Sequence, residues 1–288
     1  NVNQLELSWI TGADELKGSI TTSDWGGGTG LRYQFSEALS FKTSIEKSFR
    51  LPLANEVLGN STTIYPNYRI KPESSMNINL GLSGLIQSRT NHRLSYEISG
   101  FIRKVEDYIR LQISESEGMS QYQNVNNVSI RGMESELHYS AGKAFEAMAN
   151  ISYLYEVNKT KFQNNGKPEI TYNNRMPNRP WLYANGGISY HLFNPLRIAD
   201  SKLTLGYDLR YVHWFYLTWE GYGALKAKST IPTQWISNAS VNYSWCNDRY
   251  SLTFNCDNLF DNIVYDKYKL QKPGREFSIR FKMFINSL

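Results

Sequence analysis

A chain of 288 residues is long enough for one large domain, and 14% aromatic residues with a mean hydropathy of −0.48 is an unusual combination for a water-soluble protein. Its formal net charge of +5 comes from 31 basic and 26 acidic residues dispersed along the chain, so no basic run indicates a nucleic-acid partner. No stretch approaches about 18 uninterrupted apolar residues, which excludes a membrane-spanning helix. The remaining way to cross a bilayer is a closed β-barrel, because only closure satisfies every backbone polar group in lipid.

Apolar side chains recur at every second position in many segments, which predicts strands with one apolar and one polar face. Near the C-terminus, for example, Phe277, Ile279 and Phe281 alternate with Ser278 and Arg280. A helix would instead need apolar residues three and four positions apart. The same pattern predicts about twelve strands, near 4–10, 28–35, 39–49, 76–86, 93–113, 121–140, 145–156, 181–192, 202–216, 233–244, 249–258 and 275–284.

Short and long connections alternate between these predicted strands. The short ones are 36–38, 87–92, 141–144, 193–201 and 245–248, and the long ones lie near 11–27, 50–75, 157–180, 217–232 and 259–274. The connection 114–120, on the side of the long ones, is of modest length. Tight periplasmic turns and long extracellular loops are typical of outer-membrane barrels, whereas a soluble β-sandwich, the alternative all-β fold, has no reason to segregate them. We therefore expect an all-β, antiparallel transmembrane β-barrel in the outer membrane, with its last strand ending on the periplasmic side.

Several short motifs resemble, in order, those of the TonB-dependent receptors of Gram-negative outer membranes. They are Ser48-Phe49-Arg50-Leu51-Pro52 with Asn55-Glu56, Ile70-Lys71-Pro72-Glu73-Ser74, Tyr122-Gln123-Asn124-Val125 with Arg131-Gly132-Met133-Glu134, Asn258-Leu259-Phe260-Asp261, and Pro273-Gly274-Arg275-Glu276-Phe277. Turn and side-chain chemistry favours a loop-fixing role for these residues over ligand contact. The sequence departs from the family at its end, where Phe284 is followed by further residues instead of closing the chain.

The resemblance implies a plugged barrel, and large plugged transporters of the outer membrane use about 22 strands. With about twelve strands predicted, residues 1–288 are expected to be the C-terminal part of one barrel domain, with the plug and the N-terminal strands outside this chain. The resemblance also implies a receptor that imports a scarce nutrient, with a ferric siderophore or similar metal chelate as the first candidate. Its implied partners are outer-membrane lipid and lipopolysaccharide, that small nutrient ligand, TonB acting through the missing plug, and other outer-membrane proteins; it implies no resident cofactor.

Aromatic and basic residues near the predicted lumen mouth are the candidate ligand contacts. Strand alternation turns Trp214 and Tyr216 inward, and they continue into Trp219 and Tyr222, a cluster suited to stacking on a planar or glycan ligand. Arg175 and Arg179, together with Lys159, Lys161 and Lys167, make the 157–180 loop basic, which would attract an anionic chelate. The alternatives are aromatics that only pack the loop and a basic loop that faces lipopolysaccharide.

Neither catalysis nor a metal site is predicted. The four histidines, at 92, 138, 191 and 213, have no HxH or HxxxH spacing, and none has an obvious serine and orienting partner beside it. Cys246 and Cys256 are expected to be free thiols, because they lie too far apart along a turn and strand to pair. The sequence leaves other functions open: a non-transporting barrel subunit of a larger outer-membrane complex, a complete 12-stranded pore, and an outer-membrane enzyme.

Overall fold

The computed structural model describes residues 2–11, 14–23, 25–60, 62–114, 119–163, 165–220, 229–267 and 269–285. Strands dominate the described chain, with one short α-helix and one 3₁₀ turn. In chain order the elements are β1 (Val2–Thr11), β2 (Asp14–Ser23), β3 (Gly27–Ser36), β4 (Leu39–Arg50), α1 (Ala54–Leu58), β5 (Ile64–Tyr65), β6 (Glu73–Gln87), β7 (His92–Ser114), β8 (Met119–Ala141), β9 (Phe145–Asn158), β10 (Leu182–Phe193), η1 (Pro195–Arg197), β11 (Lys202–Val212), β12 (Phe215–Tyr216), β13 (Thr230–Ile231), β14 (Gln234–Trp245), β15 (Tyr250–Asp257) and β16 (Glu276–Met283).

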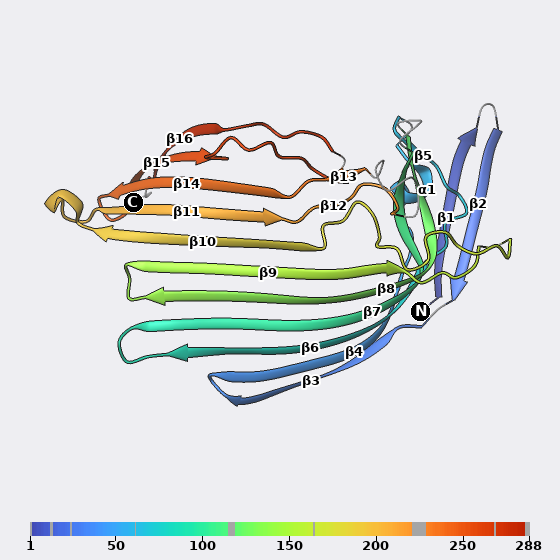
Figure 1. The fold of residues 1–288 in the computed structure, drawn as a ribbon, viewed down its shortest axis with the longest axis horizontal. Coiled ribbons are helices and arrows are strands. Elements are labelled where there is room, and N and C mark those ends of the chain that lie inside the picture. Colours follow the sequence, from blue (N-terminus) through green and yellow to red (C-terminus); the bar gives the residue numbers. More distant parts are fainter. Residues whose placement is uncertain are drawn as a thin grey trace.

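A 12-stranded sheet forms the body of the structure, in the order β16-β15-β14-β11-β10-β9-β8-β7-β6-β4-β3, with β5 pairing beside β8. Successive strands along this path are antiparallel, and only β5 pairs in parallel. The predicted antiparallel all-β architecture is therefore confirmed. Figure 1 shows the strands lying side by side in a single curved sheet whose described order is linear, with β3 and β16 at its two ends.

The N-terminal segment differs from the sequence prediction. The strand expected near 4–10 is present as β1, but it pairs with β2 in a separate two-stranded sheet rather than with the main sheet. Strand β2 occupies residues expected to belong to a long connection. Its sequence, DELKGSITTS, has too few apolar residues to display a period of two, so the alternation could not reveal it.

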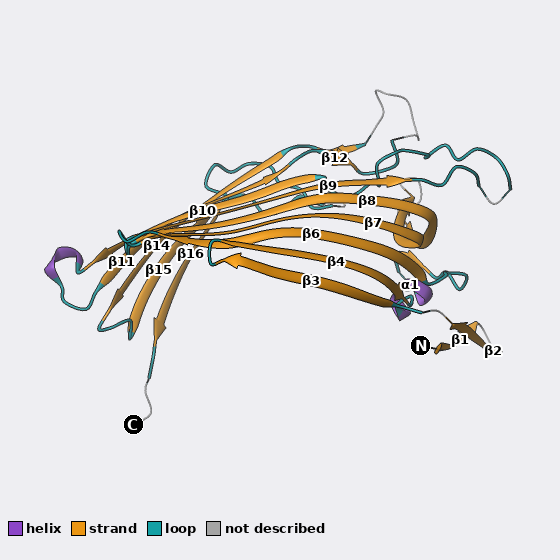
Figure 2. Ribbon diagram, turned by 90° about the horizontal axis from the view of Figure 1, so that it is seen from below, coloured by secondary structure: helices purple, strands orange, loops and turns teal. Residues whose placement is uncertain are grey.

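The connections divide the sheet into two ends, as predicted. Short turns join β3 to β4, β6 to β7, β8 to β9, β10 to β11 and β14 to β15, at the left of Figure 1. The long connections gather at the opposite end, where β7 and β8 bend out of line with the other strands (Figure 2). The C-terminal end of β16 lies with the short turns, on the side that the sequence assigned to the periplasm.

Strand register places exposed apolar side chains in rows across one face, which we call the outer face. Leu205 on β11 pairs with Val241 on β14, and both are about two-fifths exposed. At the short-turn end the rings of Tyr243, Trp245 and Tyr250 lie 5.6 Å apart between successive centroids. At the loop end Tyr211 lies 4.4 Å from Trp235. Two aromatic bands separated by an aliphatic belt match the girdles of an outer-membrane barrel.

The buried core lies at the loop end rather than beneath the sheet. It consists of side chains from β7, β8 and the loops above them: Val105, Tyr108, Val125, Val128, Ile130, Met176 and Trp219. Val105 and Tyr108 both enter this core although they are an odd number of residues apart. Asp107 between them has a φ of +52°, which interrupts the alternation and swaps the two faces of β7.

Among the described residues, no helix is both long and apolar enough to cross a membrane.

A buried carboxylate ties β4, β6 and the bend in β7 together. Glu73 is 4% exposed and accepts hydrogen bonds from Arg50 Nε at 3.0 Å, from Arg50 Nη2 at 3.1 Å and from the Ile109 backbone N–H at 2.7 Å. Arg50 Nη1 also donates to Glu56, which in turn accepts from the Leu53 N–H at the start of α1. These are residues of the first two motifs, and their role is to hold the 51–72 connection against the wall.

We expect Glu73→Gln to lower the free energy of unfolding by about 2 kcal/mol. This is less than the ~3–5 kcal/mol for breaking a fully buried pair, because the Arg50 side chain is 39% exposed. Stability falls because glutamine replaces one carboxylate oxygen with an NH₂ group. That group is a hydrogen-bond donor and would face the N–H donors of the Arg50 guanidinium. Urea unfolding of the full-length protein in lipid vesicles measures it, with the exposed Glu46→Gln as control. Equal stabilities of the two variants would contradict the network's importance.

The assignment of the two faces predicts opposite effects for neighbouring positions on β7. Ile98 is 42% exposed on the outer face, whereas Ser99 pairs with Glu134 on the other, inner face. Ile98→Arg should lower stability by about 2–4 kcal/mol, because it puts a charge in hydrocarbon. Ser99→Arg is the control and should have little effect in the same unfolding assay; the reverse ranking would show that the faces are misassigned.

Candidate ligand-binding site at the loop end

A hollow of about 310 Å³ lies on the inner face, where β11 and β14 meet the 259–274 loop. Its apolar side chains come from the ends of both strands and from the loops: Val212, Phe215, Ile236, Val264 and Tyr265. Phe215 and Val264 are only 3% and 4% exposed, so this lining is fixed by packing. Strand alternation explains its position, since Val212 and Ile236 occupy the rows opposite Tyr211 and Trp235.

Three cations surround this apolar lining. Arg210, Lys267 and Lys272 line the hollow with one carboxylate, Asp266. All three cations are exposed, and none forms an ion pair within the described part of the chain. An apolar hollow with an excess of positive charge around it suits an anionic ligand that also carries aromatic or apolar groups. Sequence reasoning missed this hollow because its residues come from three separate segments with no shared motif.

The predicted basic residues lie beside this hollow but are engaged by the protein. Arg179 Nη1 lies 3.5 Å from Oε2 of Glu156, whose side chain is 4% exposed. Burial tends to lower the pKa of Arg179, but the Glu156 carboxylate and then Tyr108 hold it above its usual value. The Arg175 guanidinium stacks over the rings of Tyr155 and Trp181, at 4.7 and 4.6 Å from their centroids. Both arginines therefore also shape the loop.

The predicted aromatic residues separate into two groups. Tyr216 lines a small cleft with Arg175 and Arg179 and donates to Glu220 at 3.2 Å; burial and then Glu220 raise its pKa, so the phenol stays neutral. The ring centroid of Trp214 lies 5.3 Å from that of Tyr216 and 6.1 Å from that of Trp181. The Trp181 ring also lies 4.3 Å from the ring of His213.

Trp219, by contrast, belongs to the buried core and is 6% exposed. It lines a different hollow, of about 250 Å³, over the bend of β7 and β8. Tyr222 lies outside the described residues. The structure thus brings Arg175, Arg179 and Tyr216 together, with Trp214 adjacent and Trp219 apart.

Three further motif residues, Asn258, Asp261 and Asn124, hydrogen-bond to the backbone of connecting segments. Asn258 accepts from the Asn262 N–H and donates to its carbonyl, and Asp261 accepts from the Arg275 N–H at 2.8 Å. The side chain of Asn124 bridges Lys71 and Asp107 by donating to both carbonyls. These hydrogen bonds confirm the predicted loop-fixing role for Asn124, Asn258 and Asp261.

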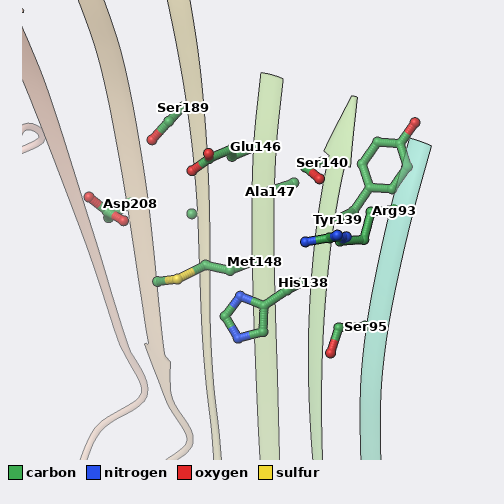
Figure 3. Close-up of a pocket in the computed structure, with 11 residues that line it drawn as sticks. Arg93, Ser95, His138, Tyr139, Ser140, Glu146, Ala147, Met148, Ser189 and Asp208 are labelled. Carbon is green, nitrogen blue, oxygen red and sulfur yellow. The ribbon is translucent and has the colours of Figure 1, made fainter. Parts of the chain in front are cut away.

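A further hollow, of about 240 Å³, lies on the inner face near the short turns. Figure 3 shows His138 and Met148 at its centre, with Glu146, Ser189 and Asp208 on one side and Arg93 and Ser95 on the other. A Cβ at Gly187 would come within 2.6 Å of the Asp208 carboxylate, so glycine leaves this space open. Its mixed charges are those of a wet inner wall.

The described residues contain no cluster of three His, Cys, Asp or Glu side chains that could hold a metal ion. Within the same ranges both cysteines are free, Cys246 exposed and Cys256 buried, as the sequence predicted. The described side chains at the loop end include cations, aromatic rings and amides, which can bind a ligand non-covalently.

A one-layer antiparallel sheet with an apolar outer face, two aromatic bands and segregated long loops is the wall of a transmembrane β-barrel of the outer-membrane type. The chain belongs to the TonB-dependent receptor family: the family model described as "TonB dependent receptor-like, beta-barrel" matches residues 9–259. The protein is accordingly an outer-membrane protein of a Gram-negative bacterium, as the sequence resemblance implied. Comparison with curated proteins finds no match.

Solved structures share this fold. The chain is similar to the copper transporter OprC, with 16% identity and a TM-score of 0.67, covering 94% of this chain and 41% of that one. It is similar to the siderophore receptor PirA from Acinetobacter baumannii, with 16% identity and a TM-score of 0.63, covering 92% of this chain and 41% of that one. It is also similar to the FrpB iron transporter from Neisseria meningitidis, with 15% identity and a TM-score of 0.61, covering 92% of this chain and 39% of that one. The chain thus spans about two-fifths of the length of these structures.

The Glu156–Arg179 contact predicts the behaviour of the 157–180 loop. With Glu156→Gln the half-exposed Arg179 guanidinium loses its buried carboxylate partner. We therefore expect the loop to open more often and trypsin to cleave after Lys159, Lys161 or Lys167 several-fold faster. Digestion of intact cells followed by mass spectrometry measures the rate. Glu146→Gln, at the short-turn end and exposed, is the control; unchanged cleavage would show that the ion pair does not hold the loop.

Proposed function

We propose that this chain is the wall and part of the ligand-gathering mouth of a TonB-dependent importer, whose nutrient is a ferric siderophore or a similar metal chelate. The observation that supports the proposal most directly is the apolar hollow with Arg210, Lys267 and Lys272 around it. Many ferric chelates are anionic and carry planar or apolar groups, which such a hollow would attract and bury.

The position of the hollow fits capture from outside. It lies at the loop end of the inner face, so a ligand held there would stand above the interior of the barrel. In this proposal the remaining wall strands and the plug come from outside residues 1–288, and TonB acts on that plug from the periplasm. The present chain would bind and enclose the ligand, while the energy for its passage would come through TonB.

The names of similar structures favour this proposal over the other functions. OprC is described as a copper transporter, FrpB as an iron transporter and PirA as a siderophore receptor. A non-transporting subunit of a larger outer-membrane complex is the second candidate. It would use the same outer face but would have no need for three unpaired cations around an apolar hollow.

Uptake by cells that produce the full-length protein tests the proposal. Radioactive iron is supplied on a panel of purified catecholate and hydroxamate chelates to an iron-starved host and to the same host lacking TonB. We expect uptake of one class of chelate and its loss without TonB. Arg210→Glu combined with Lys272→Glu should raise the apparent KM by at least about tenfold, because two attractive charges become repulsive.

Lys143→Glu, the same charge change at an exposed short turn, is the matched control and should leave uptake unchanged. Uptake that persists without TonB would contradict energised import. No uptake of any chelate, together with persistent co-purification of another outer-membrane complex, would favour the second candidate.

A further inference from the structure

A second hollow at the loop end is lined almost entirely by amides and hydroxyls. It is the hollow of about 250 Å³ that Trp219 lines, built from the far ends of β7 and β8 and from the 157–180 loop. Its polar side chains are Gln112, Gln123, Asn124, Asn126, Asn158, Thr160, Gln163, Glu169 and Thr171. It shares no lining residue with the basic hollow over β11 and β14. We propose that this amide hollow is a separate binding site for a neutral, hydroxyl-rich ligand, namely a sugar unit.

The floor of the amide hollow is a rigid, buried polar network. Asn158 is 2% exposed, donates to the Thr171 hydroxyl at 2.7 Å and accepts from the Thr160 N–H at 2.9 Å. Thr171 donates to Glu169 at 2.8 Å, and Thr160 accepts from the Asn127 N–H at 3.0 Å. The network fixes both strand β8 and the loop, so the hollow exists before any ligand arrives.

Within the described residues, three side-chain amides around this floor form no hydrogen bond with the protein. Within the described ranges, the side chains of Gln112, Asn126 and Gln163 make no hydrogen bond, and all three are half-buried. A carboxamide presents a donor and an acceptor side by side. Vicinal hydroxyls of a sugar present the same pair in return, so each amide can bind two neighbouring hydroxyls at once. Three such groups around one hollow match a ring that carries hydroxyls on several sides.

The charge of the lining argues against an anionic ligand. No Lys or Arg belongs to the lining, and its one ionisable group is the carboxylate of Glu169. Two cations of the neighbouring segments contact the protein: Arg110 lies over the Trp219 ring at 5.4 Å from its centroid, and Lys159 donates to Asn173 at 2.6 Å. The side chain of Lys161 is exposed and does not belong to the lining. An anionic chelate would meet Glu169 without compensation, whereas a neutral hydroxyl could donate to it.

The size of the amide hollow fits a small ligand. Its volume of about 250 Å³ lies just below the ~300 Å³ at which pockets for drug-sized ligands begin, so it suits a single sugar ring. Trp219 supplies the apolar wall against which the C–H face of a ring can pack. The sugar could be part of a free oligosaccharide or of lipopolysaccharide in the surrounding membrane, and these sources share the same chemistry.

Binding to the purified full-length protein tests the inference. The protein is held in a detergent without a sugar headgroup, because glucoside and maltoside detergents would compete. Saturation-transfer NMR and calorimetry are run with methyl glucoside, methyl mannoside, methyl galactoside and N-acetylglucosamine, with glucuronate as the charged counterpart, and with isolated lipopolysaccharide oligosaccharide. We expect at least one neutral sugar to bind and glucuronate to bind more weakly.

Gln112→Ala, Asn126→Ala and Gln163→Ala should each weaken that binding by about fivefold, the effect of one lost net hydrogen bond. Gln87→Ala, an exposed amide at the short-turn end, should leave it unchanged. Binding of the lipopolysaccharide oligosaccharide alone, lost in the triple variant, would support the site and identify its source. No binding by any sugar, or equal binding by wild type and triple variant, would overturn the inference.

This outcome is independent of the nutrient proposal. Sugar binding is measured on purified protein without TonB, whereas chelate import is measured in cells and depends on the basic hollow. Failure of the sugar-binding test would leave the chelate-import proposal intact, and the reverse also holds, because the two sets of substituted residues do not overlap.

Discussion

The pairing of every backbone N–H and C=O group across neighbouring strands is the constraint on which this structure rests. In hydrocarbon no water can replace a missing partner, so the strands must remain in continuous register. The register in turn decides which side chains face lipid, because a slip of one residue would move every apolar side chain to the wrong face. From β6 to β11 the pairing runs without interruption across the membrane-facing part of the sheet. The outer aliphatic belt and the wet inner wall are both consequences of that one arrangement.

Beyond the membrane, different interactions stabilise the chain. Where β7 and β8 outrun the wall, water is available again and the backbone can bend. Here side chains, and no longer hydrogen-bond ladders alone, hold the structure: Glu73 binds Arg50 and the backbone at Ile109, and Glu156 lies against Arg179. Both carboxylates are almost fully buried, in contrast to the exposed charges of the inner wall. The amide hollow is built on this packed region, and a binding site needs such rigid walls.

The sequence predicted the wall well and the mouth poorly, for reasons that lie in particular residues. A period of two is a local signal, so β11, with Leu203, Leu205 and Leu209 in one row, could be located from its own residues. Strand β2 has no such row and was missed. The predicted strand 202–216 turns Trp214 and Tyr216 inward, and the same alternation would place Phe215 on the outer face. In the structure β12 is separate from β11, and the Phe215 ring is 3% exposed and lines the basic hollow. The side chains that line each hollow come from segments as distant as Arg210 and Lys272, and no local pattern reports such a meeting.

Asp107 illustrates what a single residue can do to such a ribbon. Its positive φ reverses the two faces of β7. In the lower half, before Asp107, the even-numbered side chains face lipid, whereas in the upper half, after Asp107, the even-numbered Tyr108 enters the core at the loop end. The apolar alternation of the lower half therefore does not dictate which residues of the upper half face inward. Substitutions in the upper half can therefore alter the loop-end surface while the lower half keeps the alternation that fits the bilayer. The ligand specificity of such a receptor can change without any change in its membrane-spanning strands.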